Sequence, residues 1–148
     1  MYTKINEKDS AMKLGAIYSK EKTTFTLFSP VADSVFVIFY DKGNDSAETG
    51  RLEMLRGEGE LRSIFSATAE GNLDGVYYTY EVHTSDGTFS SHDPYARACG
   101  VNGHRSMVID LSKTDPDGFA DEDRPKLADP MSMVITEVSI CLLYTSDA

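Results

Sequence analysis

Apolar and polar residues alternate one by one through several short stretches of the chain. In the clearest stretch, Val76, Tyr78, Tyr80 and Val82 alternate with Tyr77, Thr79, Glu81 and His83. A period of two over eight residues indicates a strand with one buried face. Asp86-Gly87 ends the pattern, and glycine accepts the positive φ that a tight hairpin turn needs. Residues 88–90 are then expected to form the returning strand of a hairpin.

Shorter runs of the same kind predict strands on both sides of this hairpin. They cover residues 14–18, 24–29, 34–40, 52–55, 61–67 and 106–111, and in the last of them Met107, Ile109 and Leu111 share one face. Turn residues separate these strands at the intervals typical of a two-sheet antiparallel domain. No segment has a helical period of useful length. The pattern therefore predicts an all-β, immunoglobulin-like antiparallel β-sandwich.

Residues 34–40 differ from the other strands because they are apolar on both faces. Val35, Val37 and Phe39 can fill the sandwich core, which leaves Phe36, Ile38 and Tyr40 on the other face. Such a strand is either covered outside or exposes a patch for contact with something else. We expect the second set of side chains to contact a domain that this chain lacks.

Aromatic rings that point outward are also the flat surfaces on which the C–H groups of sugars stack. On the predicted alternation these rings belong to Tyr77, Phe36 and Tyr40, which are the candidate carbohydrate-binding residues. The alternative for Tyr77 is contact with another domain or ordinary packing. Tyr78 and Tyr80 are expected in the core.

The pattern changes before and after these strands. Residues 1–13 are a polar lead-in, residues 14–111 form the predicted β-sandwich module, and residues 112–130 are a charged, proline-containing linker. Residues 131–140 are apolar on both faces, as a strand buried in a parallel sheet would be.

The net charge of −10 excludes several kinds of partner. It opposes binding to nucleic acid and to anionic membranes, whereas a neutral glycan meets no such opposition. The N-terminus lacks the apolar core of a signal peptide, so we expect a cytoplasmic protein with reduced thiols. Cys99 is interpreted as a small buried filler. Neither the separated histidines nor the acidic residues of the linker have metal-site spacing, so no metal or other cofactor is expected.

Several motifs in order along the chain carry a family resemblance. They are LGAIY at residues 14–18, GVYYTYEV at 75–82, DPYARA at 93–98, VNG at 101–103 and RSMV at 105–108. Together they resemble the N-terminal region of type I pullulanases, debranching enzymes of glycoside hydrolase family 13. The resemblance implies an immunoglobulin-like domain of the carbohydrate-binding module 48 type, placed before a catalytic (β/α)8 barrel.

This resemblance implies that the chain is a non-catalytic part of a longer parent enzyme. The parent would hydrolyse α-1,6 bonds of an α-glucan such as pullulan or a starch- or glycogen-derived chain. Residues 131–140 would be the first barrel strand, and the module would contact that barrel. The family's catalytic carboxylates lie on later barrel strands, so this chain carries no catalytic residue. The alternatives are another branching or debranching enzyme of family 13, or a stand-alone glycan-binding β-sandwich.

The corner formed by Asp93, Pro94, Tyr95 and Arg97 is interpreted as structural. Asp93 can cap the turn and Pro94 fixes the chain direction, while the guanidinium fork of Arg97 suits bidentate pairing. A role for Arg97 in contact with substrate is the alternative.

Residues 141–148, CLLYTSDA, resemble the in-frame translation of a sequencing adapter. We interpret them as an artefactual tail; the alternative is a natural, divergent C-terminus.

Overall fold

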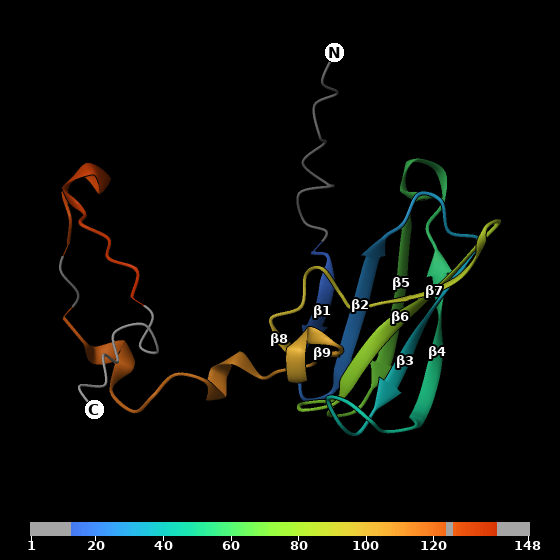
Figure 1. The fold of residues 1–148 in the computed structure, drawn as a ribbon, viewed down its shortest axis with the longest axis horizontal. Coiled ribbons are helices and arrows are strands. Elements are labelled where there is room, and N and C mark those ends of the chain that lie inside the picture. Colours follow the sequence, from blue (N-terminus) through green and yellow to red (C-terminus); the bar gives the residue numbers. More distant parts are fainter. Residues whose placement is uncertain (1–12, 124–125, 139–148) are drawn as a thin grey trace, which may run out of the picture. The chain divides into compact units, whose positions relative to one another are not determined.

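A computed structural model describes residues 13–123 and 126–138. The chain divides into two compact units, residues 1–114 and residues 115–148. All the strands of the described residues belong to the first unit, and Figure 1 labels them in chain order. They are β1 (Gly15–Tyr18), β2 (Lys22–Phe28), β3 (Ser34–Tyr40), β4 (Glu48–Arg56), β5 (Ile64–Glu70), β6 (Tyr77–Thr84), β7 (Gly87–Ser91), β8 (Ala98–Cys99) and β9 (Ser106–Met107).

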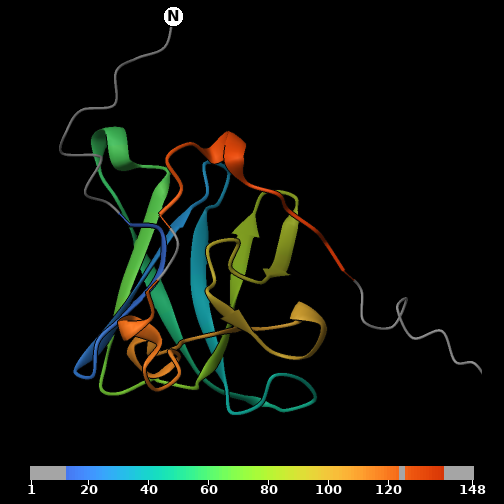
Figure 2. The ribbon, with the colours of Figure 1, turned by 90° about the vertical axis from the view of Figure 1, so that its left-hand side faces the viewer.

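Every strand pairing in this unit is antiparallel. The order of neighbours is β1-β2-β5-β4-β3-β6-β9-β8, and β7 pairs with β6 as well. β4 joins the two layers because most of it pairs with β3, while Leu55 and Arg56 pair with β5. Figure 2 shows the strands wrapping around a common interior. The immunoglobulin-like, all-β fold expected from the sequence is confirmed.

The core lies between the two layers and contains the side chains that alternation assigned to it. Tyr78 and Tyr80 are 0% and 1% exposed, and Phe25 and Leu27 of β2 lie in the same cluster. The Phe25 and Tyr78 rings meet edge to face at 5.0 Å between centroids. The other buried members of this cluster are Ala32, Val35, Val37, Met54, Phe65 and Val108. The predicted register of β2 and β6 is therefore confirmed.

β4 and β5 lie at different positions from the predicted strands. β4 begins at Glu48, before the strand predicted over residues 52–55, and β5 runs from Ile64 to Glu70 rather than over residues 61–67. The start of β4 lacks an apolar pattern because its outer face is solvated, and there the Arg51 Nε–H donates to Glu48 at 2.8 Å. Paired charges replace the apolar alternation that marks a strand. Before β5, residues 59–61 form the 3-10 turn η2 (Gly59–Leu61).

The strand predicted over residues 106–111 is shorter than expected. Only Ser106 and Met107 are strand residues, and the 3-10 turn η4 (Leu111–Lys113) follows. Ser106 and Asp110 are buried although they are polar, because each is hydrogen-bonded. Leu111 is exposed instead. Hydrogen bonding, which an apolar pattern does not reveal, decides which residues of this stretch are inside.

In the second unit, the described residues contain two short 3-10 turns, η5 (Phe119–Asp121) and η6 (Pro130–Ser132). Residues 133–138 form no strand in this chain. A barrel strand needs neighbouring strands to pair with. The assignment of residues 131–140 to the first barrel strand therefore stays a prediction. Residues 141–148, assigned to an artefactual tail, lie outside the described residues. Across the described ranges, no helix has the length and apolar character needed to cross a membrane.

Two phenylalanines on β2 give a matched test of the core. Phe25→Ala should lower the free energy of unfolding by roughly 3–5 kcal/mol, because it removes a fully buried ring. Phe28→Ala, on the same strand but 54% exposed, should lower it by less than about 1 kcal/mol. Urea denaturation followed by circular dichroism measures both. Equal losses would contradict the assigned register.

Candidate functional site

The corner after β7 is organised around the carboxylate of Asp93, which is 3% exposed. Its Oδ2 accepts hydrogen bonds from the hydroxyls of Tyr78 at 2.7 Å and Tyr80 at 3.1 Å, and its Oδ1 accepts one from the Tyr95 N–H at 2.8 Å. The Asp93 N–H donates to Ser106 Oγ at 2.8 Å. The turn-capping role expected of Asp93 is thus present, whereas the two tyrosine hydroxyls were not foreseen.

The same environment changes the acidity of the two tyrosines. Burial raises the pKa of Tyr78 and of Tyr80 well above the ordinary value, and the negative charge of Asp93 raises each pKa further. Both hydroxyls therefore stay protonated and remain donors to Asp93 at neutral pH. They hold the corner and are not acid–base groups for a reaction.

The outer face of β3 is more covered than expected. Ile38 is only 3% exposed. The Phe36 ring meets His83 edge to face at 5.5 Å, and the Arg51 guanidinium lies 5.9 Å from its centroid. The expectation that Ile38 forms part of an exposed patch is wrong. Neighbouring charged side chains and the sheet itself cover this apolar surface within the chain.

Tyr40 and Tyr77 are cross-strand partners on the same face. The Arg105 guanidinium lies 3.5 Å from the Tyr40 ring centroid, and the Tyr40 hydroxyl is 3.3 Å from Thr79 Oγ1. Tyr77 packs beside Gly43, where an added Cβ would come within 3.1 Å of the ring. Both rings are half-buried. Each ring thus has a neighbour inside the chain, and carbohydrate contact by Phe36, Tyr40 and Tyr77 stays a prediction.

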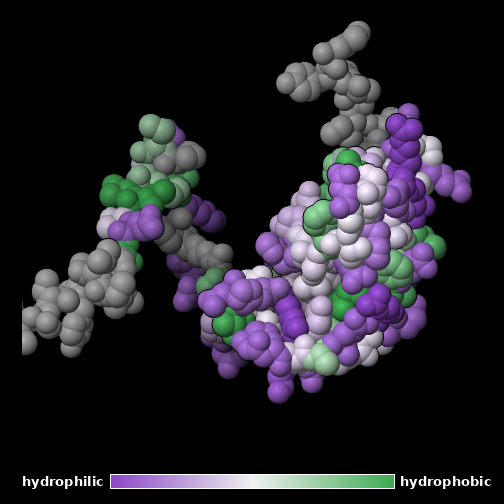
Figure 3. Space-filling view, turned by 45° about the vertical axis from the view of Figure 1, so that its right-hand side comes forward, coloured by the Kyte–Doolittle hydropathy of each residue, from purple (hydrophilic) through white to green (hydrophobic). Residues whose placement is uncertain are grey.

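Arg105 also fixes the loop between β3 and β4. It donates to the Lys42 carbonyl, the Ser46 hydroxyl and the Ser46 carbonyl at 2.8, 2.8 and 2.9 Å. The loop is held so closely to the β8–β9 connection that a Cβ on Gly100 would lie 2.6 Å from Gly43 Cα. The face of the first unit drawn in Figure 3 is mainly hydrophilic, with apolar residues in small separate areas.

A polar hollow of about 380 Å³ lies beside Tyr40. Its lining includes Thr79, whose hydroxyl is close to the Tyr40 hydroxyl. It is lined by Thr79, Ser90, Ser91, His92, Asn102, Gly103 and His104. Asn102 has a positive φ of 53°, which asparagine tolerates better than most residues. Hydroxyl, imidazole and amide groups can exchange hydrogen bonds with sugar hydroxyls. The sequence signals, Ser-Ser-His after the hairpin and Asn-Gly-His before β9, are visible but far apart.

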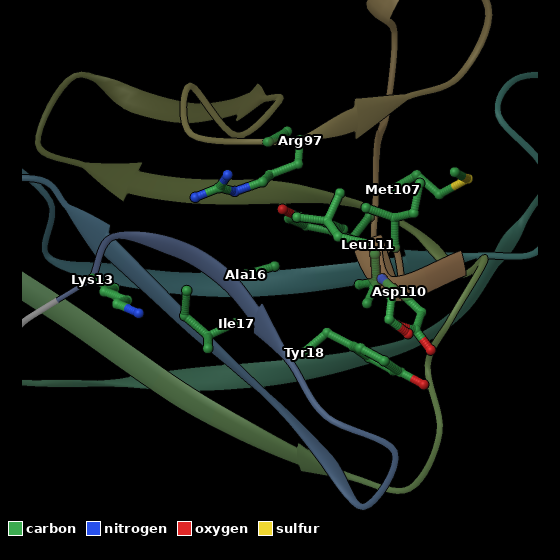
Figure 4. Close-up of a pocket in the computed structure, with 13 residues that line it drawn as sticks. Lys13, Ala16, Ile17, Tyr18, Arg97, Met107, Asp110 and Leu111 are labelled. Carbon is green, nitrogen blue, oxygen red and sulfur yellow. Dashed lines mark hydrogen bonds between the residues drawn. The ribbon is translucent and has the colours of Figure 1, made fainter. Parts of the chain in front are cut away.

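A second depression, which we call the edge groove, lies where β1 faces the residues around β8 and β9. It consists of two adjoining clefts of about 340 and 520 Å³ that share Ala96, Arg97 and Leu111. The first is lined also by Ile17, Tyr18, Met107 and Asp110, and the second by Leu14, Pro94 and Tyr95. Figure 4 shows Lys13 and Arg97 toward one end of the first cleft, with Tyr18 and Asp110 toward the other.

Potential metal ligands and one free thiol are also present among the described residues. Within residues 13–123 and 126–138, no three His, Cys, Asp or Glu side chains are grouped closely enough to hold a metal ion. Cys99 is a free thiol and is exposed, so its interpretation as a buried filler is wrong. β8 has only two residues and lies at the end of the strand order, which leaves this side chain uncovered.

The sequence of the first unit matches a known family. Residues 13–96, more than half of the chain, match carbohydrate-binding module 48, described as the isoamylase N-terminal domain. The chain belongs to this family. Its described strands form a carbohydrate-binding module 48 domain, called the module below.

The known proteins to which this chain is similar include pullulanases. Pullulanase A of Streptococcus pneumoniae is 31% identical over 116 residues, covering 74% of this chain and 9% of that protein. The structure of pullulanase from Bacillus acidopullulyticus matches with a TM-score of 0.72 and 35% identity, over 80% of this chain and 14% of the other. The structure of pullulanase from Paenibacillus barengoltzii, solved with maltohexaose and alpha-cyclodextrin, matches with a TM-score of 0.72 and 34% identity. The match covers 80% of this chain and 18% of the other.

These comparisons confirm the resemblance to pullulanases. The chain spans less than a fifth of the length of each of these three proteins.

The Asp93 corner predicts a large effect on the stability of the module. Asp93→Ala leaves two buried hydroxyls and the Tyr95 N–H without their acceptor, and should lower the free energy of unfolding by roughly 3–5 kcal/mol. Asp33→Ala, at an exposed aspartate, should change it by less than about 0.5 kcal/mol. Equilibrium urea denaturation measures both, and similar small losses would refute the assigned role of Asp93.

The raised pKa values of Tyr78 and Tyr80 predict a loss of stability at alkaline pH. Above about pH 10 the unfolded chain releases phenolic protons that the folded module keeps, so the free energy of unfolding falls as pH rises. The limiting slope is about 1.4 kcal/mol per pH unit for each tyrosine. Urea denaturation between about pH 8 and 11 should show a smaller slope for the Tyr78→Phe/Tyr80→Phe variant. An unchanged slope would speak against the pKa shifts.

Proposed function

We propose that the module is the accessory α-glucan-binding part of a pullulanase-type debranching enzyme. The observation that carries the proposal is the family match over residues 13–96, together with similarity to pullulanases over most of the chain. One of the similar structures is a pullulanase in complex with maltohexaose and alpha-cyclodextrin, which makes an α-glucan the first ligand to test.

The proposal assigns catalysis to another part of the parent enzyme. Glycoside hydrolysis needs two carboxyl groups on either side of the scissile bond. Among the described residues that line the polar hollow and the edge groove, one carries a carboxylate, Asp110. Its Oδ1 already accepts hydrogen bonds from the Ser112 N–H and hydroxyl, at 3.1 and 2.6 Å. The described lining of neither depression has the pair of carboxyl groups that the reaction requires.

Glucan contact is assigned to the outer face around the polar hollow. Hydroxyl, imidazole and amide groups from β6, β7 and the residues before β9 line the hollow, and Tyr40 borders it through Thr79. Phe36 and Tyr77 lie farther along the same face. Arg105 already lies over the Tyr40 ring, and the chain has no Trp to offer a larger platform. Binding should therefore be weak and depend mainly on hydrogen bonds.

The full chain can be tested by native gel electrophoresis through pullulan, glycogen or amylopectin. We expect weak retardation by at least one glucan. The His92→Ala/His104→Ala variant should bind roughly 3–10-fold more weakly, as expected for the loss of one or two hydrogen bonds. The chain alone should release no reducing sugar from pullulan.

Two further variants locate the effect. Arg62→Gln, at an exposed arginine outside both depressions, is the control and should migrate like the unmodified chain. Phe36→Ala tests the aromatic end of the same face. Absence of retardation by all three glucans, or release of sugar from pullulan by the chain alone, would contradict the proposal.

A further inference from the structure

The edge groove contains two cations that no described residue neutralises. In the part of the chain that the structure describes, neither the Arg97 guanidinium nor the Lys13 amine has a hydrogen-bond or ion-pair partner. The other charged groups near the groove are paired, since Lys113 lies 2.7 Å from Asp74 and 3.7 Å from Asp110. The bidentate pairing to which the Arg97 fork is suited is thus not made by another described residue. The five donors of Arg97 point to a partner elsewhere.

The groove is also apolar where it is open. Tyr95 is 49% exposed, Leu111 is 47% exposed and Ile17 is 39% exposed, and all three line its clefts. Exposed apolar surface that surrounds a charged group is typical of an interaction site, whose central part is apolar and whose charges select the partner. On the outer face of β3, by contrast, Ile38 is buried, and the rings of Phe36 and Tyr40 have neighbours inside the chain.

The backbone beside the groove gives a third feature. Among the described strands β1 pairs only with β2, and it stands at one end of the strand order. Its other edge borders the groove, whose opposite wall contains residues that follow β9. An open strand edge can accept an extended segment or surface loop through main-chain hydrogen bonds.

We propose that the edge groove is the surface on which the catalytic domain of the parent enzyme docks, and that Arg97 there pairs with a carboxylate of that domain. This inference rests on the proposed function and adds the location and chemistry of the contact. Lys13 provides a second positive charge at the same end of the groove, and Tyr95, Leu111 and Ile17 supply the apolar contact.

The net charge of this chain and the length of the similar pullulanases favour a catalytic domain as the occupant over a second copy of the chain. Each copy has a net charge of −10, which opposes self-association. In the similar pullulanases, at least four fifths of the polypeptide lies outside the region that this chain matches. A domain joined to the module by a linker needs only modest intrinsic affinity to remain docked, because the linker supplies a high effective concentration.

The test uses the complete reading frame of the source locus, expressed as the intact enzyme, beside the 148-residue chain. Arg97→Gln is placed in both proteins, with Arg62→Gln as the matched control. In the 148-residue chain neither change should move the melting temperature of the module. In the intact enzyme Arg97→Gln should lower it by roughly 4–8 °C, and Arg62→Gln should leave it unchanged.

Hydrogen exchange supplies a second measurement. Residues 95–97 and 107–112 should exchange more slowly in the intact enzyme than in the 148-residue chain, while residues 59–62 should exchange equally in both. Equal exchange at the groove, or equal effects of the two arginine variants in the intact enzyme, would overturn the docking proposal.

The outcomes also separate this inference from the proposed function. An intact enzyme that cleaves pullulan but leaves the groove accessible would overturn the docking proposal alone. A reading frame without a catalytic domain would overturn both. A dimer of the 148-residue chain that Arg97→Gln dissociates would assign the groove to contact between copies, and would also overturn the proposed occupant.

Discussion

A single buried carboxylate, that of Asp93, joins parts of the module that are far apart in sequence. It accepts hydrogen bonds from two tyrosines of β6 and from the backbone of its own corner, while its N–H reaches Ser106 of β9. A buried carboxylate is stable only when its oxygens are satisfied, so these elements must be in place together. The corner also fixes β1, because a Cβ on Gly15 would lie 2.8 Å from Tyr95 Cβ. Both walls of the edge groove thus depend on this one charge.

Arginines have opposite roles on two surfaces of the module. Arg51 and Arg105 lie near aromatic rings of the outer face and pair with neighbouring groups, which closes an apolar surface with side chains of the same chain. Arg97 lies in the edge groove and has no such partner among the described residues. The difference comes from their surroundings. Carboxylates and carbonyls are within reach of Arg51 and Arg105, whereas apolar side chains line much of the groove around Arg97.

The fold could be predicted because alternation in β2, β3 and β6 leaves little choice of buried face. Residues such as Tyr78 and Val37 combine a period of two with large apolar surface, and burial of that surface dominates the energetics. The Asp93 corner could be found as a motif, but its tyrosine partners could not, because their hydroxyls approach it only after β6 and β7 pair. Ser106 and Asp110 were missed as buried residues for a related reason, since each is held inside by hydrogen bonds. The polar hollow could not be foreseen because its residues come from three separate stretches.

The contact between Gly15 and Tyr95 has a consequence for synthesis of the protein. Of the described strands β1 is translated first, yet the residue that Gly15 contacts, Tyr95, is translated much later. Until Asp93, Tyr95 and Ser106 have emerged, a nascent chain contains β1 and β2 without the corner that fixes them. Pairing between distant segments forms slowly, and unpaired strand edges are sites of wrong association during that interval. The N-terminal hairpin of this module is therefore the part most dependent on protection while translation continues.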